Sequence, residues 1–296
     1  MEKINLPASG YSLSLAVFPV EKAKAVIQMV HGMQEHKERY YPFIEYLNKN
    51  GYAVVISDMR GHGEDAPILG HIADSQGDKT LIDDQKEIYG YIKERFPDLP
   101  VYLFGHSMGS IISRVVLQER SADYKKVILS GYVCPNPASP VAVLLGNIVK
   151  CFGKKKFSKL LANLALGPYS KAVKDRKTDL DWLSTNEENV QNYIKDPLCG
   201  FPFTNGSFDA LFHLLNNMGK AKRYVNVNKE LPFLLAGGED DPCTGGEKGR
   251  ANSKKVLEKA GFTNFDVATF KGMRHEILNE VDKASVYERM LEFLNK

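Results

Sequence analysis

The chain has 296 residues, of which 43% are hydrophobic and 25% charged, so it is long enough for one large globular domain with a well-buried core. Its formal net charge of +3 is too small to indicate a nucleic acid as a partner. The four cysteines are widely spaced, with no CxxC pair and no Cys/His cluster of metal-binding spacing. This pattern argues against a disulfide-stapled secreted domain and predicts a reduced, cytoplasmic protein.

We expect no signal peptide and no membrane-spanning helix. Residues 1–7 lack an apolar core of signal-peptide length. The longest apolar run, near Pro140–Val149, has about ten residues and is too short to cross a bilayer.

Short β-rich runs alternate with helical patterns along most of the chain, which is typical of an α/β protein with a mostly parallel central sheet flanked by helices. The expected strands are Tyr11–Phe18, Ala25–His31, Ala53–Ser57, Val101–Phe104, Lys126–Leu129, Pro232–Ala236 and Phe265–Phe270. The expected helices are Arg39–Asn48, Leu81–Arg95, Ser107–Glu119, Gly246–Lys259 and Lys283–Leu294.

The alternation stops between about Cys134 and Asn228. This stretch of roughly 95 residues has helical and loop-like patterns but no convincing strand. We interpret residues 134–228 as an inserted helical cap, or lid, over the carboxyl ends of the strands, where such folds bind ligands. Residues 1–133 and 229–296 then form the core domain.

The most informative motif is Gly105-His106-Ser107-Met108-Gly109. An apolar, β-prone run precedes it and a helical pattern follows, which is the context of a nucleophile elbow on a sharp strand-to-helix turn. Gly105 and Gly109 keep the turn open where side chains would crowd it. We predict Ser107 as a nucleophile, and the alternative is an ordinary turn whose serine caps the helix.

A serine nucleophile needs a general base and an acid that orients this base. His275 is predicted as the base because it lies in the loop between the last expected strand and the final helix. Three carboxylates, Glu239, Asp240 and Asp241, follow the preceding expected strand. Asp241 is the first choice as the acid because Pro242 favours an extended conformation there, and Asp240 is the alternative.

The negative oxygen formed in such a reaction needs backbone N–H donors. The expected strand that ends at His31 runs into Gly32-Met33, and a His-Gly at this position is typical of the loop that contributes one donor. The second donor follows the nucleophile directly. We therefore predict the backbone N–H groups of Met33 and Met108 as the oxyanion hole.

A glycine-rich segment, residues 58–65, also follows an expected strand. Its glycines lack the spacing of a phosphate-binding loop. We interpret the segment as structural, with Asp58 and Arg60 paired and the turn supporting the neighbouring loops. His62 and His106 are then scaffold residues rather than ligands.

Apolar residues recur in the expected cap at three- and four-residue spacings, with lysines between them. The apolar residues are Val141, Leu144, Leu145, Ile148, Val149, Phe152, Phe157, Leu160, Leu161 and Leu164, and the lysines are Lys150 and Lys154–Lys156. One interpretation is a lid whose apolar face lines an acyl tunnel and whose basic face contacts lipid headgroups. The other is a helix pair packed on the domain, with its lysines in water.

Four motifs occur in one order along the chain. They are His31-Gly32…Glu35-His36…Arg39-Tyr40, Asp58-x-Arg60-Gly61-His62-Gly63, Gly105-His106-Ser107-Met108-Gly109-Ser110 and Gly272-x-x-His275-Glu276. Together they resemble the monoacylglycerol lipase/lysophospholipase group of α/β-hydrolases, also labelled serine aminopeptidase-like. The resemblance covers essentially the whole chain. It implies an α/β-hydrolase fold with a helical cap, a Ser–Asp–His site with its acid at Asp241, and acyl esters as substrates.

We therefore expect a serine hydrolase that cleaves carboxylic esters, of acyl-glycerol, lysophospholipid or related type, through an acyl-enzyme and without a metal or other cofactor. The alternatives are an aminopeptidase or amidase of the same fold and a non-catalytic ligand-binding homologue. A dehalogenase or epoxide hydrolase is disfavoured, because those enzymes use an aspartate at the elbow. The expected partner is a small-molecule or lipid acyl ester, and transient contact between the cap and a membrane surface is a further expectation.

Overall fold

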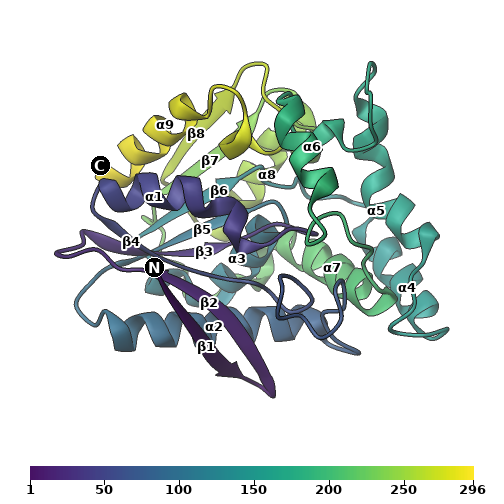
Figure 1. Cartoon of the computed structure of the whole chain (residues 1–296), viewed down its shortest axis with the longest axis horizontal. Helices are drawn as coiled ribbons and strands as arrows, with labels where there is room; N and C mark the ends of the chain where they lie inside the picture. The colour runs from purple at the N-terminus through teal and green to yellow at the C-terminus, as the bar shows by residue number, and fades with distance from the viewer.

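The computed structural model describes residues 1–296 and contains one eight-stranded sheet with helices on both faces (Figure 1). The strands are β1 (Glu2–Ala8), β2 (Tyr11–Phe18), β3 (Ala25–Val30), β4 (Tyr52–Ser57), β5 (Val101–His106), β6 (Lys126–Ser130), β7 (Phe233–Gly238) and β8 (Phe265–Phe270). Their order in the sheet is β1-β2-β4-β3-β5-β6-β7-β8. All pairings from β4 to β8 are parallel, whereas β2 pairs antiparallel with β1 and β4, so the expected α/β fold is confirmed.

Every strand and helix expected from the sequence is present, with ends that differ by a few residues. The helices are α1 (Tyr41–Lys49), α2 (Gly77–Arg95), α3 (Met108–Arg120), α4 (Ser139–Lys150), α5 (Lys159–Ala172), α6 (Glu187–Lys195), α7 (Asn205–Met218), α8 (Gly246–Ala260) and α9 (Lys283–Asn295). None of them is both long and apolar enough to cross a membrane.

The edge strand β1 is not among the strands expected from the sequence. Its residues alternate between half-buried and exposed, and it pairs with β2 through a two-residue turn that joins Ala8 to Tyr11. Both turn residues, Ser9 and Gly10, have positive φ angles of 42° and 73°, as a tight hairpin turn of this kind requires. The Ser-Gly pair between two alternating runs was the signal that could have found this hairpin.

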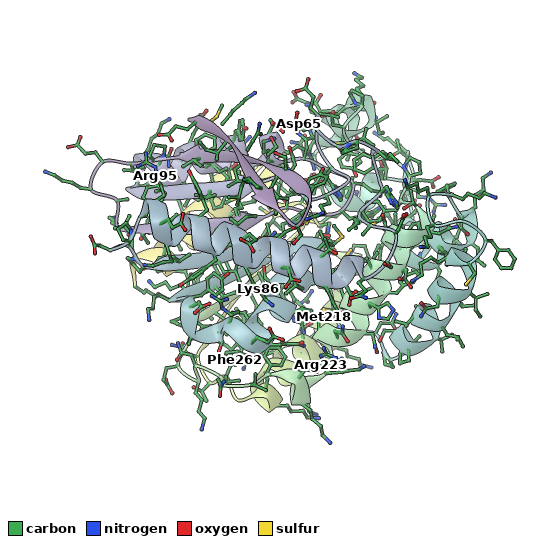
Figure 2. The ribbon with its side chains drawn as sticks, turned by 90° about the horizontal axis from the view of Figure 1, so that it is seen from below. Asp65, Lys86, Arg95, Met218, Arg223 and Phe262 are labelled. Carbon is green, nitrogen blue, oxygen red and sulfur yellow. The ribbon has the colours of Figure 1, made fainter.

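Two apolar cores hold the helices on the sheet, one on each face. The helices α1 and α9 pack on one face, where Phe43 and Val286 are fully buried. The helices α2, α3, α7 and α8 contribute to the larger core on the other face, which Figure 2 views from below, with Lys86 on α2 and Met218 on α7 labelled. The strands β3, β4 and β7 are buried along their whole length, as expected for parallel strands covered on both faces.

The segment between β6 and β7 adds no strand to the sheet. Its helices α4, α5 and α6 lie together at one end of the molecule, on the right in Figure 1. In contrast, α7 packs against α2 and α3 on the sheet as well as against α4. Residues 134–228 remain our proposed cap, and α7 connects this segment to the core domain.

Candidate active site

Ser107 lies at a sharp turn between β5 and α3. Its backbone has a φ of 51° and a ψ of −118°, a conformation that residues with a side chain rarely adopt. A Cβ atom at Gly105 would lie 2.4 Å from the carbonyl oxygen of Gly109, and one at Gly109 would lie 2.1 Å from that of Val30. Only glycine fits at either position, so the two glycines permit the elbow that the sequence predicts.

The structure brings together the three side chains that the sequence proposes as a triad. The Nε2 atom of His275 lies 2.7 Å from Ser107 Oγ, and its Nδ1 atom lies 3.0 Å from Asp241 Oδ2. The side chains of His275 and Asp241 are only 2% and 0% exposed. Asp240, the alternative acid, is exposed and does not contact the imidazole.

Asp241 is fixed by more than the histidine. Its Oδ1 atom accepts a hydrogen bond of 2.8 Å from the backbone N–H of Cys243, and its backbone carbonyl accepts one from the Thr244 hydroxyl. Burial alone would lower the pKa of His275, but the charge and hydrogen bond of Asp241 outweigh it and raise this pKa above its ordinary value. The pair therefore stabilises a protonated imidazole.

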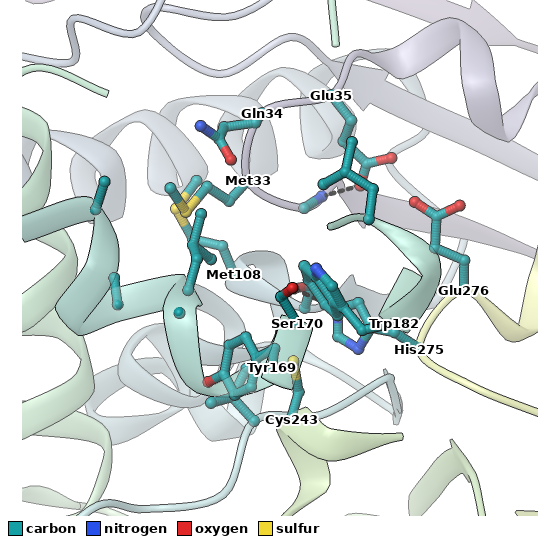
Figure 3. Close-up of a pocket in the computed structure, with 18 of the residues that line it drawn as sticks. Met33, Gln34, Glu35, Met108, Tyr169, Ser170, Trp182, Cys243, His275 and Glu276 are labelled. Atoms are coloured by element: carbon teal, nitrogen blue, oxygen red, sulfur yellow. Dashed lines mark hydrogen bonds between the residues drawn. The ribbon is translucent and has the colours of Figure 1, made fainter. Parts of the chain in front are cut away.

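Two backbone N–H groups near Ser107 have no acceptor within the protein. They belong to Met33, in the loop after β3, and to Met108, the first residue of α3. The neighbouring N–H of Gly32 is instead bound by the Glu35 carboxylate, drawn as a dashed line in Figure 3. The two free donors are those that the sequence assigns to an oxyanion hole, and the N-terminal end of α3 also favours negative charge there.

Trp182, the single tryptophan of the chain, is a site residue that the sequence analysis missed. It lies in a short 3-10 helix (Asp181–Leu183) of the proposed cap, and its ring centroid is 5.0 Å from that of His275 (Figure 3). The ring of Tyr169 from α5 packs against Trp182, with the two ring centroids 5.2 Å apart. The two aromatic rings help to exclude water from the imidazole. No motif marks Trp182, although a lone tryptophan in a cap is itself a signal.

A buried ion-pair network beside the site was also missed. The guanidinium of Arg39 donates at 2.7 Å to Glu35 and, through two nitrogens, at 2.7 Å to Glu276. Asn189 from α6 joins it with a bond of 2.7 Å to Glu276. Burial alone would raise the pKa of Glu276, but Arg39 lowers it to about 2. Arg39 thus connects the loop after β3, the loop of His275 and the proposed cap.

The expected pairing of Asp58 with Arg60 is wrong. Arg60 pairs instead with Asp84 on α2, and Asp58 pairs with Lys37. The carboxylates of Asp58 and Asp84 are both buried, at 4% and 3% exposed, so each needs its own cation, and that cation comes from a segment distant in the sequence. The segment does support the loop after β3, because the Nε2 atom of His62 accepts a hydrogen bond from the backbone N–H of Gln34.

A cavity of about 410 Å³ opens at Ser107 and His275. Its apolar lining includes Ile111, Val133, Ala162, Ala165, Leu166, Leu211 and Leu215. The expectation that the apolar pattern of α4 and α5 lines an acyl tunnel is wrong, because none of those ten residues lines the cavity. Seven of them are exposed instead: Val141, Leu144, Ile148, Phe152, Phe157, Leu160 and Leu164. The apolar lining comes instead from other residues of α5 and from α7, together with Ile111 of α3 and Val133 after β6.

Two groups of side chains have metal-ligand atoms within 4.8 Å of one another. One is Asp241, Cys243 and His275, of which two already bond each other. The other is His36, Asp196 and Cys199. In this group the carboxylates of Glu38 and Asp196 occupy both ring nitrogens of His36, at 2.6 and 2.8 Å. This second group is therefore an ion pair between the loop after β3 and the proposed cap.

A sheet of this topology with a serine at the elbow after β5 defines the chain as an α/β-hydrolase. The family described as "Serine aminopeptidase, S33" matches residues 21–282. The chain belongs to this family, and the recognition of a monoacylglycerol lipase-like α/β-hydrolase from four motifs is confirmed.

The similar proteins include lipases, a phospholipase and an esterase. The monoglyceride lipase of Mus musculus is 30% identical over 224 residues, which are 75% of this chain and 67% of that protein. Phospholipase YtpA of Bacillus subtilis is 27% identical over 279 residues, 93% of this chain and 97% of that protein. The structure of a thermostable carboxyl esterase from Bacillus coagulans in complex with glycerol has a TM-score of 0.92 and 25% identity, covering 99% of this chain and 97% of that one.

Proposed function

We propose that this α/β-hydrolase cleaves carboxylic esters of fatty acyl chains, with Ser107 as nucleophile, His275 as general base and Asp241 as the acid that orients it. The observation that carries the proposal is the continuous chain of contacts from Ser107 through His275 to Asp241, 2.7 and 3.0 Å long, at a strained elbow. This is the geometry that activates a weak hydroxyl nucleophile. Ester hydrolysis is also the activity that the names of the similar lipases and esterase share.

The proposed reaction has two steps. Ser107 Oγ attacks the ester carbonyl carbon while His275 Nε2 takes the hydroxyl proton, and the N–H groups of Met33 and Met108 bind the negative oxygen. The C–O bond to the alcohol then breaks, and the alcohol leaves with the proton from His275. In the second step, water activated by the same imidazole attacks the acyl-enzyme and releases the carboxylic acid.

The composition of the cavity supports an acyl chain joined to a polar alcohol. The apolar residues named above offer a surface for the chain, and the volume lies within the range of small-ligand sites. Part of the polar lining comes from one stretch of the proposed cap: Asn163, Ser170, Lys171, Arg176 and Asp179. Their hydroxyl, amide and charged groups suit a glycerol or glycerophosphate alcohol, so we propose acyl-glycerol or lysophospholipid-type esters as substrates.

An aminopeptidase of the same fold would need a free carboxylate to bind the amino group of its substrate. The cavity contains three carboxylates, and those of Glu35 and Glu276 are already paired with Arg39. The third, on Asp179, is 87% exposed and lies beside Arg176. These pairings favour the ester over the peptide as substrate.

We further propose that the outer face of α4 and α5 makes transient contact with an anionic membrane surface. The side chains of Leu144 on α4, Phe152 in the following loop and Leu160 on α5 are 60%, 75% and 60% accessible, which is unusual for several large apolar residues in one stretch of chain. Exposed lysines at 154–156 lie in the loop between the two helices. An apolar face bordered by lysines matches the chemistry of anionic lipids.

We also propose a cytoplasmic location for the protein. The four free cysteines support it, because a reducing compartment keeps thiols unpaired.

Hydrolysis of p-nitrophenyl esters from acetate to palmitate tests the proposed function. We expect an optimum at medium or long chains that disappears in Ser107→Ala and persists in Ser253→Ala, which changes a buried serine on α8. An optimum at acetate would contradict the lipid acyl substrate. Activity on an aminoacyl-naphthylamide but on no ester would support the peptidase. Absence of both turnover and labelling by a fluorophosphonate would support a ligand-binding homologue.

A further inference from the structure

Gln34, the residue after Met33, has an unusual backbone conformation. Its φ of 59° lies in the left-handed region, which residues with a side chain adopt only when their surroundings impose it. Met33 is the loop residue whose N–H we assign to the oxyanion hole. The conformation of Gln34 therefore bears directly on where that N–H points.

Three polar groups of Gln34 make four hydrogen bonds, and the cap segment Tyr193–Phe201 supplies the partners of three of them. The backbone carbonyl of Gln34 accepts from the Tyr193 hydroxyl at 2.7 Å and from the N–H of Gly200 at 2.9 Å. Its side-chain amide donates to the carbonyl of Phe201. The fourth bond, from its own N–H, reaches His62 at 3.3 Å.

The peptide groups on either side of Met33 are fixed as well. The Nε2 atom of His31 accepts a hydrogen bond from the backbone N–H of Met59, so the proton of this ring is on Nδ1. The Nδ1 atom donates it to the carbonyl of Gly32 at 2.8 Å. In a planar trans peptide the carbonyl and the following N–H point in opposite directions. Holding the Gly32 carbonyl therefore directs the Met33 N–H away from His31. The next two peptide groups are held by His62 and by the cap segment.

We propose that the cap segment Tyr193–Phe201 sets the oxyanion hole by holding Gln34 in its left-handed conformation, so that Gln34 and Tyr193 are positioning residues for the Met33 N–H. The inference rests on the proposed function, because it assigns a role within the same site. The cap then completes the catalytic geometry in addition to covering the cavity. The Tyr193 hydroxyl is the most direct link, because it bonds the Gln34 carbonyl from helix α6.

The test is Tyr193→Phe, which removes the hydroxyl and keeps the ring that stacks on Arg39. Tyr124→Phe is the matched control, since it removes a buried tyrosine hydroxyl bonded to Gln28 in the sheet core. We expect Tyr193→Phe to lower kcat about tenfold, less than the loss of a whole oxyanion donor, with KM unchanged. The affinity of Tyr193→Phe for a trifluoromethyl ketone, which forms a tetrahedral adduct with the serine, should fall by the same factor. Its affinity for the carboxylic acid product should equal that of the wild type.

Variants at position 34 provide a rescue experiment. Gln34→Ala loses the side-chain bond and disfavours the left-handed conformation, whereas Gln34→Gly loses the bond but adopts this conformation freely. We therefore expect the glycine variant to retain more kcat and tighter trifluoromethyl ketone binding than the alanine variant. Equal losses in the two variants would contradict a role for the backbone conformation.

The outcomes separate this inference from the proposed function. Two results would leave the hydrolase mechanism in place, with Ser107→Ala inactive, but contradict the coupling of cap and oxyanion hole. In the first, Tyr193→Phe has the same kcat as Tyr124→Phe. In the second, Tyr193→Phe changes only KM. If Ser107→Ala keeps the activity of the wild type, the proposed function fails and the inference fails with it. A parallel loss of kcat and of transition-state analogue binding supports both.

Discussion

The loops around the site and the outer face of the cap use their side chains in opposite ways. In the loops, charged groups are buried and bonded to each other: the Arg39 side chain is only 11% exposed and contacts two carboxylates. On the outer face of α4, α5 and the loop between them, large apolar side chains such as Phe152, at 75%, are exposed to solvent. The first region is completed by contacts within the protein. The second has no such partner within the chain.

This difference separates two kinds of function. Buried, fully bonded polar groups keep N–H donors and an imidazole at fixed positions before a substrate arrives, which electrostatic catalysis requires. An exposed apolar face gains free energy only when something outside the protein covers it. Substitutions in the first region should therefore affect turnover and stability, whereas substitutions in the second should affect binding to membranes.

After Ser107→Ala, which should abolish turnover, the largest expected effect inside the site belongs to Asp241→Asn. The amide no longer stabilises the protonated imidazole and favours the wrong tautomer of His275, so we expect kcat to fall about 10³- to 10⁴-fold. Steady-state kinetics on the best p-nitrophenyl ester measures this loss. The neighbouring Asp240→Asn is the control and stays within about twofold of the wild type, because Asp240 is exposed. A greater loss in Asp240→Asn than in Asp241→Asn would reverse the assignment of the acid.

Arg39→Met tests the network that connects the loops. It leaves the buried carboxylates of Glu35 and Glu276 without their cation, which costs about 3–5 kcal/mol of the free energy of unfolding. Denaturant titration measures this change. Lys86→Met breaks two pairs at the surface, with Asp83 on α2 and Glu119 on α3, and should cost less than about 1 kcal/mol. Similar stabilities of the two variants would mean that the network does not hold the site together.

The dependence of kcat/KM on pH tests the environment of His275. The imidazole acts as a base only when neutral, and its pKa is raised above the ordinary value of 6.5 because Asp241 outweighs the effect of burial. Activity should therefore decline with falling pH through a midpoint above 6.5, and Asp241→Asn should move this midpoint down. A wild-type midpoint below 6.5 would contradict the account of the pair.

The smallest effect on catalysis is expected at the outer face of the cap. Phe152→Ser should weaken co-sedimentation with vesicles of phosphatidylglycerol severalfold and leave kcat on a soluble ester unchanged, because Phe152 does not line the cavity. Val281→Ser, which changes an 80% exposed residue just before α9 in the core domain, serves as the control for a general loss of apolar surface. Wild-type protein that does not bind these vesicles at low salt would remove the membrane proposal.

The local parts of the site could be predicted because each depends on a short motif. The elbow at Ser107 requires glycines two residues away on either side, and the order of strands and carboxylates points to Asp241 and His275. Each of these features is encoded within a few residues of chain, and so is visible in the sequence.

The partners that come from distant segments could not be predicted. Arg60 pairs with Asp84 rather than Asp58, and Trp182 reaches His275 only through the path of the cap. The sequence also left open what the apolar face of α4 and α5 contacts, since periodicity shows that a helix has such a face but not what it faces. In each case the answer depends on tertiary packing.

Labelling with a fluorophosphonate, followed by mass spectrometry of the peptides, tests the central claim most directly. The account predicts one adduct, on Ser107, which forms in Ser253→Ala, is absent in folded Ser107→Ala and is blocked by a trifluoromethyl ketone. An adduct on another residue, or unlabelled protein that still hydrolyses esters, would contradict the assignment of Ser107 as the nucleophile.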